Sequence, residues 1–180
     1  PSTTALRAAV PLPVPGRIEM SVTAAPGFVA AGCHAGIKRR KHDMALIATD
    51  NGQPVSCAAV FTQNKFVAPP VVLDRARLAA SGGKAAAVVV NSGNANAGTG
   101  AAGLADAEAM TEAAAAALGI GRQDVLVCST GIIGTPLPMD LILKAVPKLA
   151  KKLSVEGAEE AAKGILTTDH RPKEAAVNGS

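Results

Sequence analysis

The sequence contains no tryptophan and no tyrosine, and phenylalanine occurs only three times among its 180 residues. Hydrophobic residues still make up 48% of the chain, so its core has to be built from alanine, valine, leucine and isoleucine. Such small side chains allow helices and sheets to pack closely. A chain of this length forms one domain, or a large part of one, with enough residues to bury a core.

Charged residues are also scarce, at 18% of the chain, which predicts that another chain covers part of the surface. The net charge is only +4, and aromatic side chains that could stack on bases are few, so nucleic acid is not an expected partner. The one basic run, at residues 38–42, is interpreted as a solvated loop, and a site for an anionic substrate is the alternative.

The three cysteines, Cys33, Cys57 and Cys128, include no Cys-x-x-Cys pair and are odd in number. This pattern argues against a disulfide framework or a zinc site and predicts a reducing, cytoplasmic location. Cys57 and Cys128 lie in apolar runs and are expected to be buried. No run approaches the roughly 18 apolar residues of a membrane span, and no signal-peptide pattern precedes the first strand. The three histidines lack metal-ligand spacing, so no metal is expected.

The hydrophobic pattern predicts a mixed α/β chain with one domain over residues 22–180 and an extended, proline-rich segment over 1–21. Strands are predicted at 28–32, 44–49, 55–62, 85–90 and 125–128, and helices at 74–84, 104–118, 139–153 and 155–166. Asp50-Asn51-Gly52 is expected to form a hairpin turn, which makes the first half an antiparallel meander. Pro147 is expected to kink or interrupt the third helix, and Ser154 to cap the fourth.

Two of the buried strands are each followed by a polar, glycine-rich segment: Asn91–Gly100 after the first and Ser129–Gly134 after the second. If the strands run parallel, both segments lie at the same end of the sheet. Hydroxyl groups and backbone amides at such a strand end can hold a developing oxyanion. Ordinary turns are the simpler alternative. A nucleotide-binding module is another, although Gly131-x-x-Gly134 lacks the dinucleotide fingerprint.

No group of residues in the sequence forms a complete set of catalytic residues, with a nucleophile and a base. The chain has no Gly-x-Ser-x-Gly elbow, and its aspartates, including Asp43 and Asp124, have the setting of turn or cap residues. The chain therefore either binds without catalysing, or takes its nucleophile from another polypeptide.

Several separated motifs, spread from about Val22 to Lys173, resemble the α chain of the ornithine acetyltransferases, bifunctional glutamate N-acetyltransferases of arginine biosynthesis. The motifs are Asn91–Ala97 with Thr99-Gly100, Ser129–Gly134 with Leu137–Asp140, Ile165–Asp169 with Pro172-Lys173, and the early strand Ala58–Asn64. The resemblance implies an α/β sandwich, with helices outside two β-sheets, that a β chain completes. It also implies an α2β2 assembly without a metal or a tightly held cofactor.

By the same resemblance, a precursor cuts itself before a threonine, which becomes the N-terminal nucleophile of the β chain. That threonine would take acetyl from N-acetylornithine and pass it to glutamate, and some members also use acetyl-CoA. The resemblance maps an oxyanion hole onto the Thr130 hydroxyl and the Gly131 amide, and substrate binding onto Thr167. A self-cleaving aminopeptidase or amidase on the same scaffold is the alternative activity.

This sequence departs from the family at two points. It stops at Asn178-Gly179-Ser180, before the Lys-Gly-x-Gly-Met segment whose lysine binds substrate in the family. Gly98 stands where many relatives carry cysteine, and this difference leaves the chemistry untouched.

Overall fold

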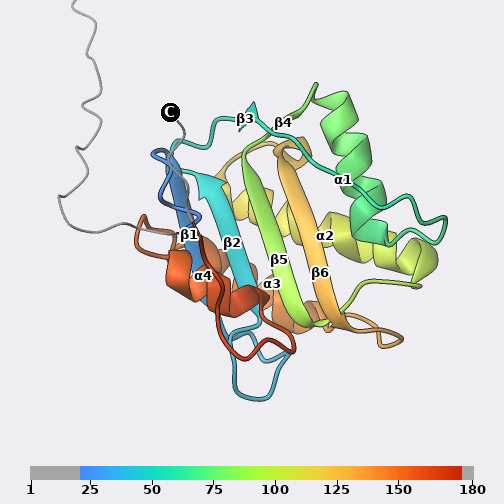
Figure 1. The fold of residues 1–180 in the computed structure, drawn as a ribbon. Coiled ribbons are helices and arrows are strands. Elements are labelled where there is room, and N and C mark those ends of the chain that lie inside the picture. Colours follow the sequence, from blue (N-terminus) through green and yellow to red (C-terminus); the bar gives the residue numbers. More distant parts are fainter. Residues whose placement is uncertain (1–20, 176–180) are drawn as a thin grey trace, which may run out of the picture.

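The computed structural model describes residues 21–175, so the extended segment predicted for 1–21 lies outside the described residues apart from Ser21. Its main feature is a four-stranded sheet in the order β1 (Phe28–Cys33), β2 (Met44–Thr49), β5 (Ala87–Asn94) and β6 (Val125–Ile132). The first three strands pair antiparallel, whereas β5 and β6 run parallel. β6 therefore forms one edge of the sheet (Figure 1).

Helices lie on both faces of this sheet. α2 (Gly100–Leu118) and α3 (Met139–Ala150) cover one face, and α4 (Ala158–Ile165) covers the other face over β1, β2 and part of β5 (Figure 1). α1 (Pro69–Ala80) runs beside the edge strand β6, and a short 3-10 turn, η1 (Arg122–Asp124), leads into that strand. Two short strands, β3 (Val55–Ser56) and β4 (Lys84–Ala85), form a separate pair.

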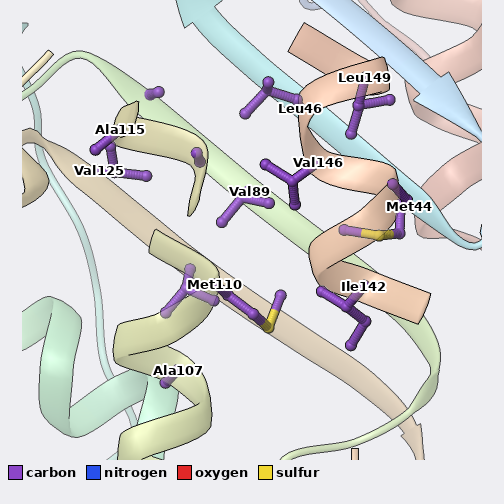
Figure 2. Packing of buried hydrophobic residues seen from close by; sticks show 14 of the residues in the cluster. Met44, Leu46, Val89, Ala107, Met110, Ala115, Val125, Ile142, Val146 and Leu149 are labelled. Atoms are coloured by element: carbon purple, nitrogen blue, oxygen red, sulfur yellow. The ribbon is translucent and has the colours of Figure 1, made fainter. Parts of the chain in front are cut away.

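The main core lies between the sheet and the pair of helices α2 and α3. Met44 and Leu46 of β2 and Val89 of β5 meet Met110 of α2 and Ile142 of α3, and all five side chains are fully buried (Figure 2). A smaller cluster beneath α4 consists of Ala30, Ala45, Val90 and Ala161. The expectation of an aliphatic core is confirmed, since neither cluster contains an aromatic side chain among residues 21–175.

α4 approaches the sheet so closely that backbone meets backbone. A Cβ atom at Gly32 of β1 would lie 1.8 Å from the carbonyl oxygen of Glu160, and one at Gly164 would lie 2.3 Å from that of Met44. Gly157, just before the helix, would meet Ala30 in the same way, at 1.8 Å. Glycine at these three positions therefore fixes the distance between α4 and the sheet.

The prediction of an α/β chain is confirmed, but residues 21–175 alone do not form two facing sheets. The return strand predicted at 55–62 is wrong in its extent and its partner: only Val55 and Ser56 form a strand, and they pair with β4. Asp50–Gly52 does form a turn, yet β2 cannot continue into a hairpin there because β1 and β5 already occupy both of its edges.

The predicted helices exist, but several boundaries differ. α1 begins at Pro69 instead of residue 74, since proline at the first helical positions loses no hydrogen bond. α2 begins four residues early and ends as predicted, with Gly119 in the left-handed conformation at φ 70°. α3 runs through Pro147 without interruption. It ends at Ala150, before the predicted end at residue 153.

The fourth helix is shorter than predicted, and Ser154 does not cap it. The backbone of Ser154 pairs instead with Ala30 of β1, with N–O distances of 3.0 and 3.1 Å, and the helix starts after Gly157. Across residues 21–175, no helix is both long enough and apolar enough to cross a bilayer.

Candidate functional site

The carboxyl ends of β5 and β6 form the candidate site. The two strands run parallel, which is the condition for both polar motifs to lie at one end of the sheet, and the pairing places Ser92 opposite Thr130 and Gly93 opposite Gly131. Both strands extend further than predicted, because Asn91–Asn94 and Ser129–Ile132 belong to the strands and not to loops. The two polar motifs therefore lie side by side in register at one end of the sheet.

Thr130 lies on the sheet face that carries α4, but beyond the cover of that helix. Val125 and Val127 point into the core beneath α2, so alternation along the strand turns Cys128 and Thr130 to the opposite face. Both residues are exposed there. α4 lies over β1 and β2 and leaves this face of β6 uncovered (Figure 1). The prediction that Cys128 is buried is wrong for this reason, and Cys57 is half-buried in irregular chain after β3.

Two side chains of α1 mark the outer edge of β6. Asp74 Oδ1 accepts a hydrogen bond from the Val127 N–H at 3.0 Å, and the Arg77 guanidinium donates to the Val125 carbonyl. Backbone groups two residues apart in a strand point the same way. The amide of Gly131 is therefore directed outward, away from β5, where α1 no longer covers the edge.

Gly131 occupies a conformation and a space that only glycine fits. Its φ is 134°, in the region that residues with a side chain rarely adopt. A Cβ atom there would lie 2.3 Å from the Gly93 carbonyl carbon and 2.6 Å from the Asn94 nitrogen. The backbones of β5 and β6 thus lie so close at this point that no larger residue fits at position 131.

The asparagines of the first motif hold the backbone around the site. Asn91 donates to the Asn94 carbonyl at 2.7 Å, Asn94 to the Pro136 carbonyl at 2.9 Å, and Asn96 to the Gly103 carbonyl at 2.7 Å. All three side chains are buried. The buried Oδ1 atoms of Asn91 and Asn94 and the buried Oγ of Ser129 find no hydrogen-bond partner among the described residues.

Thr167, the predicted substrate-binding residue, comes two residues after the end of α4. Ser92 Oγ donates to the Gly164 carbonyl at 2.5 Å, which anchors the last turn of α4 beside the carboxyl end of β5. Hydrogen bonds from the Lys173 ammonium and the Thr167 backbone lower the pKa of Asp169. Thr167 and Thr130 thus reach the same end and the same face of the sheet, although no hydrogen bond joins them within residues 21–175.

Lys38 is a residue of this region that sequence reasoning missed. Arg39, Arg40 and Lys41 are exposed, as predicted, but the Lys38 ammonium donates to the His42 carbonyl at 2.8 Å and to the Leu166 carbonyl. Burial lowers the pKa of Lys38. Nothing in the basic run distinguishes Lys38 from its neighbours, since only the fold brings it to the end of α4.

The loop that carries Lys38 is held by a carboxylate. Asp43 is fully buried, and its two oxygens accept hydrogen bonds from the backbone N–H groups of Ala35 at 2.6 Å, Gly36 at 3.1 Å and Lys38 at 2.9 Å. Hydrogen bonds of this kind to a charged acceptor are stronger than those between neutral groups. Within the described part of the chain, no three His, Cys, Asp or Glu side chains lie close enough together to hold a metal ion.

Asp74 gives the edge of the site a measurable dependence on pH. Burial raises its pKa from 3.8 to about 6, against the opposing effects of the Val127 N–H and Arg77. Between these two pH values the folded chain holds a proton that the unfolded chain releases, so this group makes stability fall as pH rises through the window. Above pH 6 the charged carboxylate costs about 3 kcal/mol.

Replacing Asp74 by asparagine is therefore expected to stabilise the protein at neutral pH. The amide oxygen still accepts the Val127 hydrogen bond, and no charge is buried. In urea titrations at pH 7.5, Asp74→Asn should raise the free energy of unfolding by about 1 to 3 kcal/mol, with a smaller gain below pH 5. The exposed Asp50→Asn provides the control, and a loss of stability in Asp74→Asn at pH 7.5 would contradict the expectation.

Comparisons of the sequence and of the structure with known proteins point to the same family. The family model described as the ArgJ family matches residues 29–180. The chain is 51% identical over 154 residues to the arginine biosynthesis bifunctional protein ArgJ of Caldanaerobacter subterraneus, covering 86% of this chain and 36% of the relative. It is 48% identical over 151 residues to the protein of the same name from Streptomyces coelicolor, covering 83% and 39%. The chain thus spans less than half the length of these relatives.

Two crystal structures have a similar fold. One is ornithine acetyltransferase complexed with ornithine from Mycobacterium tuberculosis, with a TM-score of 0.78 and 43% identity, covering 85% of this chain and 82% of that one. The other is the arginine biosynthesis bifunctional protein argJ of Bacillus halodurans, with a TM-score of 0.77 and 42% identity, covering 85% and 79%.

Proposed function

Because this chain belongs to the ArgJ family, we propose that it is the α part of a self-cleaving ornithine acetyltransferase of arginine biosynthesis. The complete enzyme would move acetyl from N-acetyl-L-ornithine to L-glutamate. The observation that carries this proposal is the corner formed by Thr130 and Gly131, where an exposed hydroxyl and an outward-directed amide lie next to each other at the open end of β6.

In the proposed reaction, the N-terminal threonine of a β chain attacks the acetyl carbonyl of N-acetylornithine, and its own α-amine accepts the hydroxyl proton. The carbonyl oxygen becomes an oxyanion, which the Thr130 hydroxyl and the Gly131 amide stabilise by hydrogen bonds. The intermediate then expels ornithine, whose leaving amine takes up a proton, and leaves an acetyl-threonine ester. The amine of glutamate attacks this ester, releases N-acetylglutamate and restores the threonine.

Two features support a second chain at this corner. The face of β6 around Cys128 and Thr130 is uncovered, and Ile132 and Ile133 are exposed by 69% and 68%. In addition, this chain spans about four-fifths of the matched crystal chains but less than two-fifths of the curated relatives. That difference is what division of a longer precursor would produce.

Other parts of the proposal follow from the family resemblance. Thr167 would bind the substrate, and the anchoring of α4 by Ser92 supports this by bringing Thr167 to the same face as Thr130. The assembly would be an α2β2 heterotetramer in the cytoplasm, with acetyl-CoA as a further possible donor. The nucleotide-binding alternative loses support because Gly131 belongs to a strand and not to a phosphate-binding loop.

The proposal is tested by expressing the complete gene and analysing the purified product. We expect two polypeptides, the second beginning with threonine by N-terminal sequencing, and transfer of acetyl from N-acetylornithine to glutamate. A panel that includes aminoacyl amides separates transferase from aminopeptidase activity. A single uncut chain with full activity, or hydrolysis of the amides without transfer to glutamate, would overturn the proposal.

A further inference from the structure

We propose that Lys38 is a positioning residue that sets the place of the substrate-binding segment at Thr167; this inference rests on the function proposed above. The Lys38 side chain joins three segments that are distant in the sequence. Its ammonium donates to the carbonyl of Leu166, directly before Thr167, and to the His42 carbonyl at 2.8 Å in the loop before β2. Its aliphatic stem lies against Gly93 of β5.

The stem connects Lys38 to the oxyanion corner. A Cβ atom at Gly93 would lie 2.8 Å from Lys38 Cγ, so the lysine fills the space that a larger residue would occupy. Gly93 in turn touches Gly131 through its backbone. One side chain therefore contacts both the residue that precedes Thr167 and the strand that supports the Gly131 amide, so it can hold the substrate-binding segment at a fixed distance from the reacting carbonyl.

The charge of Lys38 suits the end of a helix. Leu166 is the C-cap residue of α4, where carbonyl groups lack helical partners and carry partial negative charge. The carboxylate of Asp43 binds the Lys38 backbone N–H at 2.9 Å. No carboxylate forms a salt bridge with the ammonium among residues 21–175. The ammonium thus contacts backbone carbonyls, so its role is to hold two segments of backbone in place.

The loop around Lys38 is rigid enough for this role. Asp43 accepts three backbone N–H groups from residues 35–38, and the Asp43 carbonyl accepts the Ser92 N–H at 2.8 Å. Ser92 in turn donates to Gly164 of α4. The backbone of Lys38 is therefore linked through Asp43 and Ser92 to β5 and to α4, the same helix whose C-terminal carbonyl its ammonium binds.

The test compares Lys38→Met with Lys41→Met in the complete two-chain enzyme. Methionine keeps an apolar stem against Gly93 and removes only the donors, while Lys41 is an exposed lysine of the same run. Lys38→Met is expected to raise the KM for N-acetylornithine about tenfold and to leave kcat within about twofold. It should also speed amide hydrogen exchange in residues 166–169 without substrate, and Lys38→Arg should restore most of the protection. Lys41→Met should change neither quantity.

The outcomes separate the possible roles. A raised KM with unchanged exchange would mean that Lys38 binds substrate directly, and unchanged KM and exchange would mean that it has no role; both overturn the inference. If Lys38→Met cannot be purified, Lys38→Gln, whose neutral amide is too short to replace the ammonium, decides the matter: a raised KM together with faster exchange at a native melting temperature supports positioning, and a KM and exchange equal to those of the unmodified protein overturn it. Faster exchange in a protein that shows no acetyl transfer would defeat the proposed function and leave the ordering role of Lys38 intact.

Discussion

Replacing Thr130 by alanine is expected to lower kcat about 10²-fold, because it removes one of the two donors proposed to face the oxyanion. The side chain is exposed and makes no hydrogen bond to the described residues, so the fold should tolerate its loss. KM should change little, since the hydrogen bond forms with charge that develops only in the transition state. Steady-state kinetics with N-acetylornithine and glutamate measures both constants.

Two variants serve as controls for Thr130→Ala. Thr130→Ser keeps a hydroxyl on the same strand position and should retain most of the turnover. Thr135→Ala removes an exposed threonine from the loop after β6 and should leave both constants unchanged. A Thr130→Ala enzyme with the turnover of the unmodified protein would show that the hydroxyl does not stabilise the oxyanion.

Replacing Gly131 by alanine is expected to have a still larger effect, since it damages both the fold and the site. The new methyl group would meet backbone atoms of Gly93 and Asn94 at 2.3 to 2.7 Å, and neither strand can move aside without losing its pairing. The positive φ adds conformational strain. Together these effects should lower the free energy of unfolding by about 2 to 5 kcal/mol and turnover by more than about 10²-fold.

Gly134 provides a matched control for that substitution. It also has a positive φ, of 91°, but a Cβ atom there would have nothing within 4 Å. Gly134→Ala should therefore show only the conformational cost, about 1 kcal/mol, with near-normal turnover. Urea titrations and kinetics on both variants give the comparison. Equal effects at the two positions would mean that close contact between β5 and β6 is unimportant for the site.

The local sequence pattern was sufficient to predict those helices and strands whose structure depends on residues close to them in the sequence. The continuous apolar run Val125–Cys128, rich in β-forming residues, predicted a buried strand, and Gly119 predicted the end of α2. The same kind of pattern placed the two polar motifs directly after two buried strands. The parallel pairing that brings the motifs together is compatible with the strand–helix–strand order, but the pattern left it as a condition.

Other features depended on partners that local pattern does not reveal. The strand predicted at 55–62 cannot pair with β2, because β1 and β5 already flank β2. Ser154 does not cap α4, because its backbone N–H and C=O groups pair with Ala30 of β1. The polar ends of β5 and β6 were predicted to be loops because asparagine and glycine are uncommon in strands. Lys38 could not be singled out, since its partner Leu166 lies 128 residues further along the chain.

The direct seating of α4 on the sheet has a consequence for how relatives of this protein could diverge. Side chains between two layers normally act as adjustable spacers, so successive mutations can tilt a helix and reshape a neighbouring pocket. Here Gly32, Gly157 and Gly164 leave no spacer to exchange. The position of α4 on the sheet would therefore stay the same. Changes in substrate preference, whether by natural drift or by laboratory selection, would have to come from the residues that follow Leu166 or from the opposing chain.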